Sequence, residues 1–144
     1  MNMNPLAPVS EIMTKNVMTL SPNDNLLNAK HIFDGNKIHH LPVVDEGQVI
    51  GILSKNDLLR ITPGWYKDAT ANDEFFEKIK IADAMTKKIA KVQANERIDV
   101  VALILSENRF HAVPVVNESN ELLGIITTFD LIRNAYKLTQ EAWA

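Results

Sequence analysis

The sequence predicts an α+β fold built from two copies of one β-α-β-β-α unit, and three observations support this prediction. The chain has 144 residues, which allows one compact domain or two small units that share a core. The sequence matches itself when it is shifted by 72 or 73 residues. Apolar patterns typical of strands and helices also follow one another in the same order in both halves.

The internal repeat consists of several short segments that occur twice in the same order. These pairs are Met13-Thr14-Lys15 with Met85-Thr86-Lys87, Pro42-Val43-Val44 with Pro114-Val115-Val116, Gly51-Ile52 with Gly124-Ile125, and Asp57-Leu58 with Asp130-Leu131. Ordered matches at a fixed spacing are the signature of a duplicated structural unit. We therefore expect a first repeat with an N-terminal segment at 1–61, a linker at 62–80 and a second repeat with a C-terminal helix at 81–144.

Each repeat is expected to begin with a short amphipathic turn, a short strand and a helix. The turns are predicted at 9–13 and 81–85, and the strands near 17–20 and 89–92. Asn23 and Asn95 are the predicted N-caps of the helices, whose apolar residues recur at helical spacing. Those residues are Leu26, Ala29, Ile32 and Phe33 in the first repeat, and Ile98, Val101, Ala102 and Leu105 in the second.

Two apolar runs then predict a β-hairpin in each repeat, at 41–44 with 49–53 and at 113–116 with 122–126. Asp45-Glu46-Gly47-Gln48 between the first two runs suits a tight reversal. A final helix is expected to start near Ser54 or Thr127. Because a unit of about 55 residues buries too little surface to be stable alone, we expect the two repeats to pack sheet to sheet with pseudo-two-fold symmetry.

The segment 62–80 has no counterpart elsewhere in the sequence, and we expect a linker with about one helical turn. Its aromatic residues favour packing or oligomer contacts over a ligand site; they are Trp65, Tyr66, Phe75 and Phe76. The apolar faces of the final helices suggest a homodimer, and the tail that follows contains Tyr136, Leu138 and Trp143. The alternative is that this tail packs on its own chain.

Composition and charge exclude several classes of function. Apolar residues are 46% and charged residues 23% of the chain, which is usual for a globular protein. A net charge of −3 with mixed signs favours neither a nucleic acid nor a membrane as a partner. No apolar run approaches the roughly 20 residues that span a bilayer, and the chain has no cysteine. We expect a cytoplasmic protein.

Three motifs occur once in each repeat and carry a resemblance to a known family. They are Ile/Ala-Met-Thr at 12–14 and 84–86, His-x-x-Pro-Val-Val at 39–44 and 111–116, and Gly-Ile-x-(Ser/Thr)-x-x-Asp-Leu at 51–58 and 124–131. With these motifs the chain resembles a tandem pair of cystathionine-β-synthase-type (CBS) domains, called a Bateman module, over about 9–134. The resemblance implies a regulatory module that binds AMP, ADP, ATP or S-adenosylmethionine in clefts between the repeats. It implies no catalytic residue and no required cofactor.

The resemblance also implies roles for the last motif of each repeat. Asp57 and Asp130 would receive the ribose hydroxyls, because an ionised carboxylate accepts strong hydrogen bonds from a vicinal diol. Ser54 and Thr127 precede a helix start, where a phosphate is favoured. However, Ser54-x-x-Asp57 and Thr127-x-x-Asp130 also have the spacing of a capping box. Helix capping alone explains the same residues.

Further candidate binding residues follow from the resemblance. The adenine candidates at the first strand are Thr14, Val17, Met18, Thr86, Ile89 and Ala90. They can equally be core residues. The phosphate candidates are His39, His40 and His111. The other candidates are Pro42, Asn56, Ala112, Pro114 and Phe129. A histidine at a strand entrance can be structural instead, and the repeats diverge, since Ala112 matches His40 and Phe129 matches Asn56.

Two other kinds of site are not expected. The adjacent His39 and His40 would point to opposite faces of a strand, which does not assemble a metal site. Neither Ser54 nor Thr127 lies in a nucleophile-elbow motif, so we expect no enzyme. A ligand sensor would have to act on a separate effector protein. The alternative is a structural dimerisation or interaction module of the same fold that binds no ligand.

Overall fold

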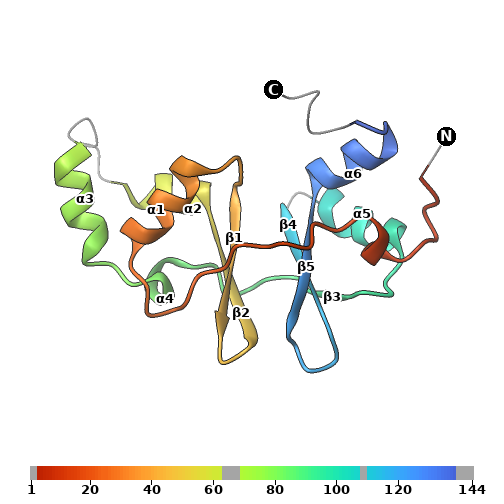
Figure 1. Ribbon diagram of the computed structural model, residues 1–144, viewed down its shortest axis with the longest axis horizontal. Helices are drawn as coiled ribbons and strands as arrows, with labels where there is room; N and C mark the ends of the chain where they lie inside the picture. Colours follow the sequence, from red (N-terminus) through yellow and green to blue (C-terminus); the bar gives the residue numbers. More distant parts are fainter. Residues whose placement is uncertain (1–2, 63–68, 108–109, 139–144) are drawn as a thin grey trace. The chain divides into compact units, whose positions relative to one another are not determined.

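The computed structural model describes residues 3–62, 69–107 and 110–138 (Figure 1). It is a mixed α+β fold in which helices accompany two small sheets, as the sequence predicts. The elements in chain order are η1 Val9–Glu11, α1 Leu26–Gly35, β1 His40–Asp45, β2 Gln48–Ser54, α2 Lys55–Ile61, α3 Ala69–Glu77, α4 Ile81–Ala84, β3 Val92–Gln93, α5 Ile98–Ser106, β4 Ala112–Val116, β5 Leu122–Thr127 and α6 Thr128–Ala135. None of the helices described is long and apolar enough to cross a membrane.

The chain forms two compact units that do not follow chain order. The central unit is Met18–Lys88, and the terminal unit combines Met1–Val17 with Ile89–Ala144. The start of the first repeat therefore packs with the second half of the chain, and the start of the second repeat packs with the first half. Each unit therefore combines segments of both repeats, because backbone pairing between distant segments decides which parts pack together.

The sheet of the central unit is the predicted hairpin, β1 with β2, which is antiparallel. Its turn consists of Glu46 and Gly47, whose φ angles of 49° and 81° lie in the left-handed region that glycine adopts readily. Leu20 pairs in parallel with Val43, so the strand expected near 17–20 is reduced to one bridge.

Helix α1 packs its predicted apolar face into the core of the central unit. Leu26, Ala29 and Phe33 are buried there. The predicted N-cap, Asn23, is wrong by two residues: Asn25 caps the helix, and its side chain accepts a hydrogen bond from the backbone N–H of Asn28 at 3.0 Å. The reason is a turn ahead of the helix, in which the backbone N–H of Asp24 donates to the carbonyl of Ser21 at 3.1 Å.

The linker contains a longer helix than expected. Helix α3 has nine residues, not about one turn. Its Phe76 is buried in the core of the central unit, and its Asp73 accepts a hydrogen bond from Lys30 of α1 at 2.7 Å. Tertiary contacts with α1 therefore stabilise a helix in a segment that the sequence alone predicts to be mostly a linker. The linker residues Pro63, Gly64, Trp65 and Tyr66 lie outside the described residues.

The sheet of the terminal unit has the order β3-β4-β5. Strand β3 is parallel to β4 and has two residues, of which Val92 belongs to the strand expected near 89–92, whereas β4 and β5 form the predicted antiparallel hairpin. The hydrophobic core cluster of this unit is formed by buried apolar residues of η1, α5 and all three strands. They are Val9, Val92, Val101, Leu105, Val113, Val115 and Ile126.

The N-terminal segment takes the place of a side-chain cap on α5. Asn95, the predicted N-cap, is wrong: the N-cap is Arg97, and it makes no side-chain capping bond. Instead, the backbone N–H groups of Ile98 and Asp99 donate to the carbonyls of Ala7 and Pro5, each at 2.9 Å. Figure 1 shows this red segment beside α5. A distant stretch of backbone thus satisfies the helix donors that lack a partner in the helix.

Each sheet is extended by a threonine that follows a methionine. Thr86 pairs with Ile52 of β2, and Thr14 pairs with Ile125 of β5. The neighbouring glycines allow this approach. A Cβ on Gly51 would lie 2.9 Å from the carbonyl oxygen of Thr86, and one on Gly124 would lie 2.8 Å from that of Thr14. Contacts this short are repulsive, so both positions require glycine.

We predict that Gly51→Ala and Gly124→Ala each lower the free energy of unfolding by about 1–3 kcal/mol, the usual cost of overpacking. Gly35→Ala is the matched control. It lies at the end of α1 with nothing within 4 Å of its added Cβ, so it should be neutral or stabilising. Urea unfolding monitored by circular dichroism measures all three. A loss in Gly35→Ala as large as in the other two variants would contradict the prediction.

Candidate functional site

Two charged side chains are buried among the described residues, Asp57 and Asp130, with 4% and 6% of their surface exposed. They occupy equivalent positions, because each is the third residue of the helix that follows a hairpin. Burying a carboxylate is costly unless hydrogen bonds and opposite charges compensate for the lost water. The partners of each carboxylate therefore define its environment.

Asp57 is held by the start of α2 and by an arginine. Its Oδ2 accepts a hydrogen bond from the backbone N–H of Ser54 at 2.9 Å, and Ser54 Oγ accepts one from the backbone N–H of Asp57 at 2.9 Å. These two bonds form the capping box that the sequence spacing predicts. Arg60 donates to Oδ1 at 2.7 Å, which places a positive charge directly on the carboxylate.

Asp130 has an equivalent set of capping hydrogen bonds at the start of α6. Its Oδ2 accepts from the backbone N–H of Thr127 at 2.8 Å and from the Thr127 hydroxyl at 3.1 Å. The Thr127 hydroxyl in turn accepts from the backbone N–H of Asp130 at 3.3 Å, which completes a second capping box. Capping therefore accounts for one role of Ser54, Asp57, Thr127 and Asp130.

A threonine from the opposite repeat reaches each carboxylate. The Thr14 hydroxyl donates to Asp130 Oδ1 at 3.0 Å across 116 residues of sequence, and the Thr86 hydroxyl donates to Asp57 Oδ2 at 3.4 Å. Both threonines were predicted as site residues, but the sequence does not show which aspartate each one meets. The structure pairs the first motif of one repeat with the last motif of the other.

The candidates at the strand entrances lie near the same helix starts. His40 stands opposite Ser54 in the hairpin register, and Ala112 stands opposite Thr127. Pro42 and Pro114 are buried two residues further along β1 and β4. The other candidates of this group are exposed: His39, Asn56, His111 and Phe129.

The remaining adenine candidates lie in connecting segments, not in strands. Val17, Ile89 and Ala90 are half-buried, whereas Met18 is 43% exposed. They flank the positions at which the chain passes from one unit to the other, between 17 and 18 and between 88 and 89. Their role in binding stays a prediction. Within the described part of the chain, no three His, Asp or Glu side chains are grouped as a metal site would require.

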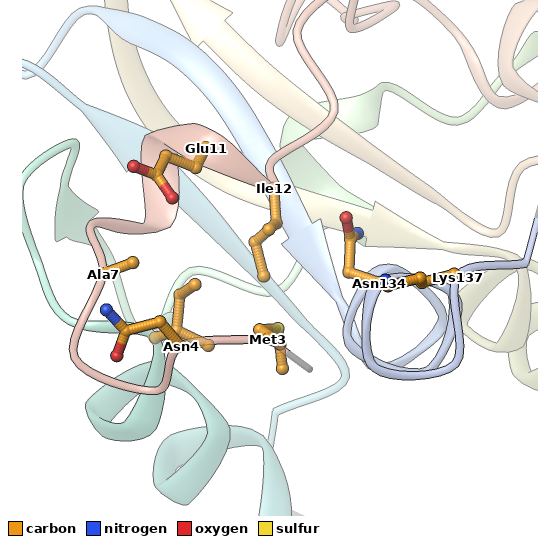
Figure 2. A pocket seen from close by; sticks show the side chains of 8 residues that line it. Met3, Asn4, Ala7, Glu11, Ile12, Asn134 and Lys137 are labelled. Atoms are coloured by element: carbon orange, nitrogen blue, oxygen red, sulfur yellow. The ribbon is translucent and has the colours of Figure 1, made fainter. Parts of the chain in front are cut away.

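The terminal unit also contains a cavity of about 260 Å³ that sequence patterns do not predict. It is lined by Met3, Asn4, Ala7, Glu11, Ile12, Ile98, Asn134 and Lys137. Figure 2 shows Met3 and Ile12 beside α6, which carries Asn134. The side-chain amide of Asn134 donates to the carbonyl of Asp130 at 2.7 Å. The cavity thus borders the helix of the candidate site, and its lining comes from segments too far apart in sequence to form a motif.

We predict that Thr14→Val lowers the free energy of unfolding by about 1 kcal/mol, since it removes a hydrogen bond to a carboxylate while keeping the side-chain shape. The bond of Thr86 is longer, 3.4 Å against 3.0 Å, and bonds weaken with length. Thr86→Val is therefore the matched control and should cost less. Urea unfolding of both variants measures the difference, and a larger loss in Thr86→Val would refute the inferred strengths.

Known proteins share the repeat and the fold. The CBS domain family model matches the chain twice, at residues 9–64 and 81–137. The L-aspartate semialdehyde sulfurtransferase of Methanocaldococcus jannaschii is 30% identical over 131 residues, which are 90% of this chain and 23% of that protein. The chain spans about a quarter of the length of the curated relatives that it matches first.

Two solved structures resemble the fold along nearly its whole length. One is the CBS domain pair of protein MJ0100 in complex with 5′-methylthioadenosine and S-adenosyl-L-methionine, which is 29% identical with a TM-score of 0.72. The match covers 90% of this chain and 95% of the MJ0100 chain. Vibrio cholerae AcuB is 27% identical with a TM-score of 0.76, and the match covers 92% of this chain and 93% of AcuB. The chain belongs to the CBS domain family and carries two CBS domains in tandem.

Proposed function

We propose that the protein is a regulatory module that binds an adenosine-containing ligand at two places, beside Asp130 with Thr14 and beside Asp57 with Thr86. The ligand would be AMP, ADP, ATP or S-adenosylmethionine. The observation that carries the proposal is the duplicated buried carboxylate, which in each unit lies beside a hydroxyl from the other repeat. The related CBS pair of MJ0100 in complex with two adenosine compounds supports this choice of ligand class.

The chemistry of the two carboxylates fits a ribose. An ionised aspartate accepts hydrogen bonds and cannot donate, so it complements the two hydroxyl donors of a vicinal diol. Bonds of this kind are stronger than those between neutral groups. Asp57 and Asp130 are each fixed by a capping box, which orients the carboxylate before a ligand arrives. A rigid acceptor loses less entropy on binding.

The pairing of motifs from different repeats offers a route for regulation. A ligand beside Asp130 would touch a segment of the first repeat at Thr14 and a helix of the second repeat. Its binding energy would therefore depend on how these segments pack. A ligand shifts such an equilibrium only by its difference in affinity for the two arrangements. The output would be read by a separate effector protein.

One observation favours the alternative, a structural dimerisation module without a ligand. The capping boxes give both buried aspartates a structural role that needs no ligand. The two functions differ in a single measurable property, which is affinity for adenosine compounds.

We predict that isothermal titration with AMP, ADP, ATP and S-adenosylmethionine detects at least one ligand with a dissociation constant below about 1 mM. The double variant Asp57→Asn/Asp130→Asn should bind it at least about tenfold more weakly, because two charge-assisted hydrogen bonds are lost. Asp45→Asn is the matched control, since Asp45 lies at the turn end of the hairpin, away from Ser54.

The same protein incubated with ATP should release no product, because a regulatory module does not turn its ligand over. Absence of binding by all four compounds would refute the proposed function in favour of the structural module. Turnover of ATP would refute the assignment of a non-catalytic role.

We also propose that the protein forms a homodimer through α6. Phe129, Ile132 and Tyr136 are 46%, 42% and 76% exposed, and their spacing places them on one face of the helix. Leu138, just beyond this helix, is 40% exposed. Exposed apolar groups that are gathered on one face favour a protein contact. Trp143, expected to contribute, lies outside the described residues.

We predict that light scattering finds a particle of twice the 16.2 kDa mass of one chain. The variant Ile132→Glu/Tyr136→Glu should be a monomer, since like charges on both sides of the contact would be buried without partners. Leu6→Glu is the control, because Leu6 is 61% exposed and lies outside α6. A double variant that remains dimeric would exclude α6 as the contact.

A further inference from the structure

The two carboxylates have equivalent capping boxes but differ in their distance to the nearby arginine. Arg60 and Arg133 occupy equivalent positions, each three residues after its aspartate. Arg60 lies 2.7 Å from Asp57 Oδ1, within hydrogen-bond distance. Arg133 Nη1 lies 3.9 Å from Asp130 Oδ1, an ion pair whose separation exceeds hydrogen-bond distance.

The residue before each aspartate differs as well. In α6 it is Phe129, and the guanidinium carbon of Arg133 lies 5.9 Å from the centroid of its ring, within the range of a cation–π contact. In α2 the equivalent residue is Asn56, which has no aromatic ring. The Arg133 head therefore contacts both the ring of Phe129 and the carboxylate of Asp130, whereas the Arg60 head forms a direct hydrogen bond with Asp57.

We propose that a ribose diol binds preferentially at Asp130, and that Arg60 restricts access to Asp57. This inference rests on the proposed function and states which of the two sites is occupied first. Arg60 and Phe129 are then residues that set the occupancy of the two sites. Phe129 acts through Arg133 and is a positioning residue.

The donors on the two Oδ1 atoms differ in chemistry as well as distance. The guanidinium of Arg60 has donors and no acceptor, so a ribose hydroxyl that binds Asp57 Oδ1 must compete with it. Asp130 Oδ1 is approached by the hydroxyl of Thr14 at 3.0 Å. A hydroxyl rotates, and it can donate to the carboxylate or accept from the ligand. A diol can therefore join Thr14 on Asp130 without expelling a charge.

The size of the effect follows from the exposure of the arginine. The Arg60 side chain is 68% exposed, and exposed ion pairs contribute little because water screens them. Its partner, Asp57, is buried, so we expect this ion pair to be stronger than a pair in which both side chains are exposed. We expect the Arg60 contact to weaken binding at Asp57 by about fivefold.

The test uses the full chain titrated with 5′-methylthioadenosine, a compound found with the CBS pair of MJ0100. This compound carries a ribose diol and no phosphate, so the charge of Arg60 has no anionic group to attract. Asp130→Asn should remove the tighter binding, and Asp57→Asn should preserve it. Asparagine keeps an acceptor oxygen for the capping box, and circular dichroism verifies the fold of each variant.

The role of Arg60 is tested in the Asp130→Asn background, where Asp57 is the remaining carboxylate of the pair. Arg60→Ala should raise the affinity about fivefold. Arg97→Ala is the matched control, since Arg97 is also exposed and forms an ion pair with a nearby aspartate, Asp99, at 2.8 Å. It should leave the affinity unchanged. In the Asp57→Asn background, Phe129→Asn should weaken binding by a similar factor, because it releases Arg133 toward Asp130.

Two results would overturn the inference while the proposed function stands. One is tighter binding that is lost in Asp57→Asn and kept in Asp130→Asn. The other is an Arg60→Ala variant with the affinity of Arg97→Ala. Failure of the wild type and of every variant to bind 5′-methylthioadenosine, S-adenosylmethionine or AMP is a different result, and it would overturn the proposed function itself.

Discussion

The pairing of a short backbone segment with the last strand of each hairpin organises the rest of this structure. Thr86 exchanges two backbone hydrogen bonds with Ile52, and Thr14 does the same with Ile125. These bonds decide which segments form each compact unit, and they bring a hydroxyl to a carboxylate. They also require glycine beside the threonine, since any Cβ at 51 or 124 would meet its carbonyl oxygen. Fold and candidate site thus share one constraint.

The buried aspartates show how a structural role and a binding role can coexist. One oxygen of each carboxylate caps a helix and accepts the backbone N–H of Ser54 or Thr127. The other oxygen accepts a hydrogen bond from a side chain that can move. This donor is the Arg60 guanidinium at Asp57 and the Thr14 hydroxyl at Asp130. The first bond fixes the orientation of the group at little entropic cost to a ligand, and the second is the one that a ligand would share or replace.

The two units resemble each other more closely in backbone structure than in their side chains. Both hairpins have a register shift at the same place, after Val43 and after Val115. Both final helices begin with a capping box. Side chains that the backbone does not constrain have diverged, as the exchange of Asn56 for Phe129 shows. Equivalent positions can therefore present a carboxylate in different electrostatic surroundings.

The sequence by itself determined the features that depend on neighbouring residues: both hairpins, the capping boxes, the apolar faces of α1 and α5, and membership of the CBS family. Contacts between distant segments decided the rest. The predicted caps Asn23 and Asn95 were wrong because a turn at 21–24 and the carbonyls of Pro5 and Ala7 occupy the helix starts. Helix α3 depends on its packing against α1. The meeting of Thr14 with Asp130, across 116 residues, follows from backbone pairing, which side-chain patterns do not reveal.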